Sequence, residues 1–228
     1  MPSSRVSGGL NHVQVRNHAK LAGVPGADST AKRRGLWLLA DEVYDRLWYE
    51  TDTLGTPVPS ILRKASRHDA VMVVHSFSKS CCMTGWRLGW LIARADLAAQ
   101  ATQLNEFIVS HAPSFTQKAG ETALRDGEPE IAAMLHRLKS NRDFCLAALA
   151  EMPRLTVPRP EGAFYLFARV EGLTDSFDFC RRLLLETKVG IAPGVAFGAG
   201  GEGSVRICYA ADRAILEPAM ERLHRFLK

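Results

Sequence analysis

The 228-residue sequence predicts an α/β domain followed by a smaller α+β domain. Short, continuous apolar runs at 36–40, 71–75 and 88–93 are typical of buried strands. Longer stretches between and after these runs carry apolar residues at helical spacing. Prolines cluster at 153–160, and strand-like and helix-like segments interleave again after them, which indicates a second unit with its own core.

The distribution of charge argues against nucleic-acid binding. The net charge of +5 belongs to residues 1–35, which hold six basic residues and one acidic residue, so the rest of the chain is neutral. A nucleic-acid-binding segment would need aromatic or patterned basic residues, and residues 1–35 contain no aromatic residue. We therefore expect no nucleic-acid partner.

Hydropathy and cysteine usage indicate a cytoplasmic protein. No run approaches 18 uncharged apolar residues, and the N-terminus lacks the apolar core of a secretory signal, so no membrane segment is expected. The five cysteines are odd in number and none has Cys-x-x-Cys spacing. This pattern favours reduced thiols over a disulfide framework or a zinc site, and we expect no metal.

Residues 1–34 are predicted to be a leader outside the folded body. They show neither helical nor strand periodicity and are rich in Ser, Gly and Ala, which predicts disorder. An Arg-rich, acid-poor leader could also be an organelle transit peptide. Sequence from a shifted reading frame or a misplaced start is a third interpretation.

The first strand ends at a pair of polar residues. The run 36–40 predicts a strand buried on both faces, and Asp41 and Tyr44 follow its carboxyl end. Ligands of open α/β sheets bind beyond the carboxyl ends of strands. Asp41 could instead cap the next helix. If the chain turns helical there, Asp41 and Tyr44 can face one side.

The second strand leads into the segment around which the chain is organised. Val71 to Val74 is a β-branched run, and Ser76, Ser78 and Lys79 follow it; Arg87 comes eight residues after the lysine. A buried strand that delivers a lysine among hydroxyl groups, with an arginine nearby, suits an anion that reacts with an amine. The alternative is a solvated lysine and a surface arginine, but the glycines and tryptophans around Arg87 argue against a solvated loop.

Among the remaining predicted strands, one carries a charged residue, Arg206. A charge inside an apolar strand needs a partner, so Arg206 either forms a structural ion pair or binds a ligand. The remaining helices are predicted at 95–109, 116–124, 131–152, 176–187 and 212–227, and the remaining strands at 162–167, 189–192 and 205–209.

The lysine segment resembles that of a known enzyme family. Ser-Phe-Ser-Lys at 76–79, followed by Gly-Trp-Arg-Leu-Gly at 85–89, is similar to the cofactor-lysine segment of class I/II aminotransferases, which are fold-type I pyridoxal 5′-phosphate (PLP) enzymes. The resemblance implies that Lys79 forms the Schiff base with PLP. It also implies that Ser76 and Arg87 hold the cofactor phosphate.

Two further segments extend this resemblance. Asp-Glu-x-Tyr at 41–44 implies that Asp41 pairs with the pyridine nitrogen and that Tyr44 binds the phenolic oxygen. A carboxylate there keeps the ring protonated as an electron sink. Gly-Ala-Phe-Tyr at 162–165 and Pro-Gly-x-x-Phe-Gly at 193–198 resemble the family's small domain, where Arg206 would grip the α-carboxylate of the substrate through its bidentate fork.

The resemblance implies a fold, a domain division and an activity. The fold is part of a fold-type I PLP-transferase large domain, with a mixed, mostly parallel sheet, plus a small α+β domain. The expected division is a leader at 1–34, the C-terminal half of the large domain at 35–127, and the small domain with its linking helix at 128–228. The activity is amino-group transfer between an amino acid and a 2-oxo acid, in an enzyme expected to be a homodimer.

Three other interpretations stay open. A β-eliminating lyase of the same fold would share every residue named above. A non-catalytic effector-binding module and an inactive fragment are the others. Complete family members carry a large N-terminal portion with a phosphate loop and a ring-stacking aromatic, for which this sequence has no room. We therefore expect that the chain by itself is not a competent aminotransferase.

Overall fold

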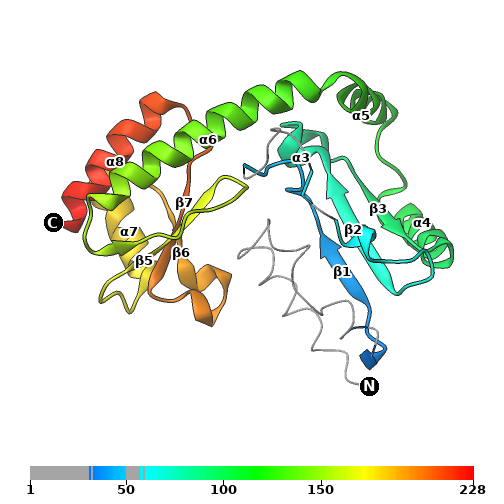
Figure 1. Cartoon of the computed structure of the whole chain (residues 1–228), viewed down its shortest axis with the longest axis horizontal. Helices are drawn as coiled ribbons and strands as arrows, with labels where there is room; N and C mark the ends of the chain where they lie inside the picture. The colour runs from blue at the N-terminus through cyan, green and yellow to red at the C-terminus, as the bar shows by residue number, and fades with distance from the viewer. Residues whose placement is uncertain (1–30, 32, 50–56, 59) are drawn as a thin grey trace. The chain divides into compact units, whose positions relative to one another are not determined.

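The computed structural model of the chain describes residues 31, 33–49, 57–58 and 60–228 (Figure 1). Nearly all of the predicted leader therefore lies outside the described residues. The chain divides into two compact units, one that runs to Leu135 and a second at His136–Lys228. Helix α6 (Glu128–Ala150) is continuous through this boundary.

The described strands of the first unit form a mixed three-stranded sheet, as the sequence predicts. The order is β1 (Leu38–Asp41), β2 (Val71–Ser76) and β3 (Gly89–Ala93). Strands β1 and β2 are parallel, whereas β2 and β3 are antiparallel. The ends of β1 and β2 and the start of β3 therefore meet at one edge of the sheet, and the candidate site residues of this unit lie there.

The prediction that the run 36–40 is buried on both faces is wrong for the described part of the chain. The side chains of Trp37 and Leu39 are 38% and 37% exposed, whereas Ala40 is buried. Strand β3 is exposed along most of its length. Within the described residues, β1 and β3 each have a neighbouring strand on one side only, so burial concentrates on the central strand, where Val73 is fully buried.

Helices of the first unit pack close to the lysine segment. Helix α4 (Ala95–Val109) follows β3 and confirms the predicted helix, and α5 (Ser114–Asp126) extends slightly beyond its prediction. Gly120 of α5 has no side chain, and this lets Leu88 and Phe77 pack closely against the helix. A Cβ at this position would overlap the Leu88 side chain. This close approach places α5 directly against the segment that carries Lys79.

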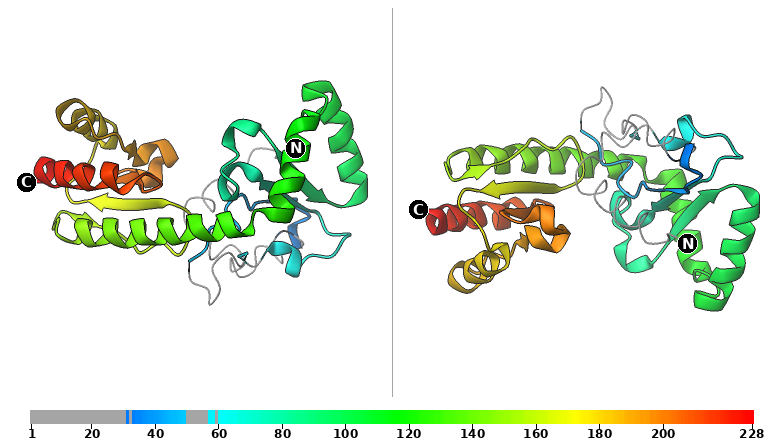
Figure 2. Two further views of the ribbon diagram at one scale, coloured as in Figure 1. Left: turned by 90° about the horizontal axis from the view of Figure 1, so that it is seen from above. Right: turned by 90° about the horizontal axis from the view of Figure 1, so that it is seen from below.

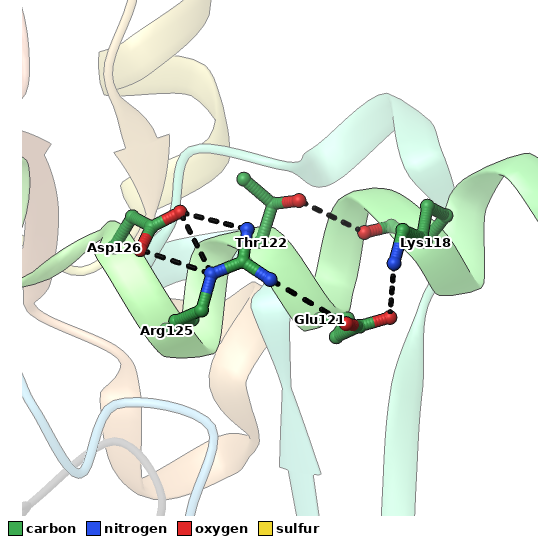
Figure 3. A network of polar contacts seen from close by, with 5 residues as sticks. All are labelled: Lys118, Glu121, Thr122, Arg125 and Asp126. Carbon is green, nitrogen blue, oxygen red and sulfur yellow. Dashed lines mark hydrogen bonds and ion pairs between the residues drawn. The ribbon is translucent and has the colours of Figure 1, made fainter.

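The solvent face of α5 carries a chain of ion pairs (Figure 3). Glu121 pairs with Lys118 at 2.8 Å and with Arg125 at 3.5 Å, and Arg125 also pairs with Asp126 at 3.0 Å. Thr122 donates a hydrogen bond to the Lys118 carbonyl at 3.2 Å. All four charged side chains are more than half exposed, so each pair contributes about 0.2–1 kcal/mol at most.

The second unit is built on an antiparallel sheet. Its described strands are β4 (Leu155–Thr156), β5 (Tyr165–Val170), β7 (Ser204–Cys208) and β6 (Ala192–Pro193), in that order across the sheet. Helix α7 (Ser176–Thr187) lies beside α8 (Arg213–Leu227), where the rings of Phe179 and Phe226 meet edge to face at 5.4 Å (Figure 2). The predicted helices at 176–187 and 212–227 are confirmed.

Strand β5 begins three residues later than the strand predicted at 162–167. Ala163 has a left-handed backbone (φ 58°), which breaks the extended conformation before Phe164. The turn is fixed by Tyr209, whose hydroxyl donates to the Ala163 carbonyl at 3.2 Å and whose N–H donates to the Phe164 carbonyl at 3.0 Å. The buried side chains Leu166, Leu183 and Leu223 form the centre of this unit's core.

A close backbone contact and a carboxylate hold the loop between β6 and β7. Gly194 and Gly201 touch through their backbones, and a Cβ on either would overlap the other's carbonyl oxygen. The Glu202 carboxylate accepts hydrogen bonds from the N–H groups of Ser176 (2.7 Å) and Gly203 (2.9 Å), which ties the loop to the start of α7. These backbone donors lower the pKa of Glu202.

No helix in the described parts of the chain is long and apolar enough to cross a bilayer.

Candidate functional site

Ser76 is the last residue of β2 and starts the helical turn that carries the lysine. Its backbone is extended, and its Oγ accepts a hydrogen bond from the Ser78 N–H at 3.1 Å, so it caps α3 (Phe77–Ser80). The same Oγ lies 2.9 Å from the Ser78 hydroxyl and 3.3 Å from the Leu88 carbonyl. Two hydroxyl groups and the lysine turn are thus held at the sheet edge.

Lys79 and Tyr44 come from different strand ends and lie together. The Lys79 amine is 5.8 Å from the centre of the Tyr44 ring. Tyr44 lies in the turn after β1, and its ring is buried. The parallel pairing of β1 and β2 brings these two residues to the same edge. The interpretation of Lys79 as a solvated loop lysine therefore does not fit.

Asp41 is the last residue of β1 and is half-buried. Its Oδ1 lies 3.3 Å from the Val43 N–H, so it stabilises the turn that follows. This turn is not a helix: its backbone hydrogen bonds run from Asp45 to Glu42 and from Leu47 to Tyr44. Asp41 thus holds the turn that carries Tyr44.

Arg87 reaches the same edge from the third strand. Ser76 lies opposite Gly89 in the β2–β3 ladder, so Arg87 lies two residues before that pair. Its backbone is left-handed (φ 54°, ψ 47°), and its guanidinium donates to the Thr84 carbonyl at 2.9 Å. A non-glycine residue in this region costs about 1–2 kcal/mol, and such residues cluster at functional sites. With Trp86, Val109 and other residues, Arg87 lines an open groove.

In the second unit, the guanidinium of Arg206 contacts two aromatic rings. The centre of its guanidinium is 4.2 Å from the Tyr165 ring and 4.3 Å from the Phe197 ring. Its Nε is buried and has no hydrogen-bond partner, and no acidic side chain of the described residues pairs with it. The structural ion pair is therefore wrong for the described part of the chain, and the guanidinium is available to an external anion.

Comparison with known proteins decides the family. Residues 28–223 match the family model described as "Aminotransferase class I and II".

The chain belongs to the class I and II aminotransferases.

Among similar proteins of this family, a probable N-acetyl-LL-diaminopimelate aminotransferase of Bacillus subtilis is 35% identical over 198 residues, covering 86% of the chain and 48% of that protein. The crystal structure of an aspartate aminotransferase from Thermotoga maritima is 36% identical, with a TM-score of 0.79, over 89% of the chain and 50% of that structure. An aromatic aminotransferase from Pyrococcus horikoshii is 33% identical, with a TM-score of 0.80, over 88% of the chain and 53% of that structure. The chain spans about half the length of these relatives.

Sequence reasoning missed several neighbours of the candidate residues in each unit. Tyr165 and Phe197 lie in the motifs at 162–165 and 193–198, and their rings contact Arg206. The available signal for these contacts was the presence of aromatic residues in both motifs together with an isolated arginine in a strand. His75 directly precedes Ser76 and lies between the carboxylates of Glu42 and Asp45. Nothing in the local sequence pattern around His75 predicts that cluster, because its partners are about thirty residues away.

Proposed function

We propose that this chain carries cofactor- and substrate-binding parts of a PLP-dependent aminotransferase, which moves an amino group between an amino acid and a 2-oxo acid. The observation that supports this most is the Lys79 amine beside the Tyr44 ring, with the Ser76 hydroxyl one helical turn away. A reactive amine next to anion-binding hydroxyl groups suits a phosphorylated aldehyde.

The residues at the sheet edge fit such a cofactor. Ser76 and Arg87 supply a hydroxyl and a cation for its phosphate. Asp41 supplies a carboxylate for the ring nitrogen, Tyr44 a phenol for the ring oxygen, and Lys79 the amine for the aldehyde. When bound, the cofactor supplies a ring that takes up the electron pair released at the substrate Cα.

Each residue then has a physical task. The Asp41 carboxylate holds a proton on the ring nitrogen, since a negative charge nearby favours the protonated form. The Lys79 amine would take a proton from the substrate Cα and later return one, as a general base and acid. Arg206 orients the amino acid through its carboxylate, because a planar guanidinium can donate two parallel hydrogen bonds to it.

Borohydride reduction tests the central assignment. In a protein preparation saturated with PLP, we expect borohydride to fix the cofactor covalently to Lys79. The peptide that contains Lys79 should then show a mass increase. Lys79→Arg removes the reactive amine and keeps the charge, so it should abolish labelling. The matched control is Lys118→Arg, at an exposed lysine on α5. Labelling of another lysine with Lys79 unmodified would refute the assignment.

Product analysis separates the transferase from a lyase of the same fold. With a ¹⁵N-labelled amino acid and an unlabelled 2-oxo acid, transfer should move the label into the new amino acid. Release of labelled ammonia with no labelled amino acid would show elimination instead.

Arg206 offers an independent test of substrate binding. In a complete enzyme that contains this chain, Arg206→Lys loses a bidentate, charge-assisted pair worth about 1.5–3 kcal/mol, which corresponds to an increase of about 10- to 150-fold in the KM for the amino acid. The matched control is Arg213→Lys, whose guanidinium also lies over a ring, that of Phe144 at 3.8 Å, but faces Glu217. An unchanged KM in Arg206→Lys would refute the substrate role.

The complete enzyme is, in this proposal, a cytoplasmic homodimer. Helix α4 exposes the apolar side chains of Phe107 (89%) and Ile108 (67%), which are more typical of interfaces than of solvent-facing helices. All five cysteines are free thiols, as expected in a reducing compartment. Because the chain spans half of its relatives, we expect residues 1–228 alone to show no turnover; ordinary turnover of the purified chain would contradict this.

A further inference from the structure

Directly before Ser76, at the end of β2, a buried histidine lies between two carboxylates. His75 Nε2 is 3.7 Å from Glu42 Oε2, and His75 Nδ1 is 3.6 Å from Asp45 Oδ2. The three side chains are 10%, 9% and 22% exposed, in the order His75, Glu42 and Asp45. The imidazole also stacks on the ring of Trp90, with centroids 5.0 Å apart and planes 16° from parallel.

The carboxylates are fixed by the backbone on their other sides. Glu42 Oε1 accepts a hydrogen bond from the Ile61 N–H at 3.0 Å, and Asp45 Oδ1 accepts one from the Arg46 N–H at 2.9 Å. The oxygens that face His75 are therefore held toward the ring. Glu42 Oε2 and His75 Nδ1 are both buried without a hydrogen-bond partner, and a closure of a few tenths of an ångström would give each one.

The number of protons in this cluster follows from its geometry. A neutral imidazole has one N–H, so its second nitrogen would point a lone pair at a carboxylate. Both contacts become attractive only if the cluster holds one more proton, either on the ring or on a carboxyl group. Without that proton, two negative charges would lie buried around a neutral ring, which is costly. Burial raises the pKa of Asp45, which agrees with such a proton.

We propose that His75, Glu42 and Asp45 share this additional proton at neutral pH, and that His75 is a positioning residue which uses it to lock residues 41–46 onto the end of β2. The locked segment carries Asp41 and Tyr44. The inference does not depend on PLP binding, because every contact in it belongs to the chain itself.

Other charged groups near the cluster do not replace this proton. The Arg46 side chain faces Asp45 from the same turn, but it is ion-paired with Glu128 at the start of α6. On the lysine side, the thiol of Cys81 lies within electrostatic reach of Asp45, and burial raises the pKa of that thiol. A thiol kept in its neutral form adds no charge to the cluster.

Nuclear magnetic resonance of residues 1–228 tests the proton count directly. With ¹⁵N-labelled histidine and ¹³C-labelled carboxyl groups, the His75 signals are assigned by their loss in His75→Gln. We expect the His75 nitrogens and the Asp45 carboxyl carbon to change together as the shared proton leaves. A bare ring nitrogen together with two ionised carboxylates at pH 7 would overturn the proposal.

Thermal unfolding tests the lock. His75→Phe keeps the stack on Trp90 and removes both nitrogens, and His68→Phe, at an exposed turn, is the control. At pH 7 we expect His75→Phe to lower the unfolding midpoint by about 3–6 °C. A proton that the folded state holds more tightly than the unfolded state stabilises the fold at low pH, and this stabilisation is lost as the pH rises through the shared step. The difference in unfolding midpoint between His75→Phe and wild type should therefore shrink as the pH rises. A gap independent of pH would show a packing role only and overturn the proposal.

Discussion

Replacing Gly89 by alanine should separate the two strands that hold the lysine segment. A Cβ at this position would lie 2.6 Å from the carbonyl oxygen of His75 on the neighbouring strand. Carbon and oxygen atoms that are not bonded approach to about 3.2 Å, so the overlap is roughly 0.6 Å. The obstructing atom belongs to the backbone, so no rotamer change can relieve the overlap.

The cost of this overlap can be bounded from the structure. Overpacking costs about 1–3 kcal/mol, and strand separation also weakens the ladder hydrogen bonds at this end, at about 1 kcal/mol each. We therefore expect Gly89→Ala to destabilise the protein by about 2–3 kcal/mol. For a chain of this length, that loss lowers the unfolding midpoint by about 4–12 °C.

The neighbouring Gly85 provides the matched control. A Cβ there meets nothing within 4 Å, and its backbone is not left-handed, so Gly85→Ala should leave the midpoint within about 2 °C of wild type. Calorimetry of wild type and the two variants measures all three midpoints. Because Ser76 pairs with Gly89, Gly89→Ala should also reduce borohydride labelling of Lys79. If Gly89→Ala and Gly85→Ala unfold at the same temperature, the reasoning is refuted.

Three other predictions concern the second unit and the thiols. Gly194→Ala should lower the unfolding midpoint far more than Gly190→Ala, whose Cβ would meet only a leucine methyl at 3.9 Å; equal midpoints would contradict the backbone contact. Glu202→Gln should destabilise the protein at neutral pH, and the difference should vanish as the pH falls below the usual carboxyl pKa of 4.5 and through the lower value of the folded state; a difference that persists in acid would exclude this cause. Exposed Cys82 should react with a thiol reagent well before buried Cys180, whose pKa burial raises to about 11, as mass spectrometry of the labelled peptides would show; equal rates would contradict this burial.

Local pattern predicted most of the elements and their order. The helix at 95–109 and the lysine segment directly after a strand are found as predicted, because the spacing of apolar residues and hydroxyl caps act over a few residues. The turn at Ala163 was missed because a left-handed alanine carries no sequence signal; a contact with distant Tyr209 fixes it.

Burial and long-range contacts were harder to predict. The run 36–40 is apolar enough for a fully buried strand, but exposure depends on what covers each face, and Trp37 and Leu39 remain partly open. The sequence identified Arg206 as an unusual charge and left its partner undecided. Only the fold shows that its neighbours are two aromatic rings and no carboxylate of the described residues.

The arrangement around Arg206 has a consequence for the entropy of ligand binding. The rings of Tyr165 and Phe197 both contact the guanidinium, so its movement is restricted once the chain has folded. A flexible side chain would lose about 0.5–1.5 kcal/mol of rotamer freedom on gripping an anion, whereas this one has already lost it. Tyr165 and Phe197 would therefore strengthen the binding of an anion by preorganising the arginine.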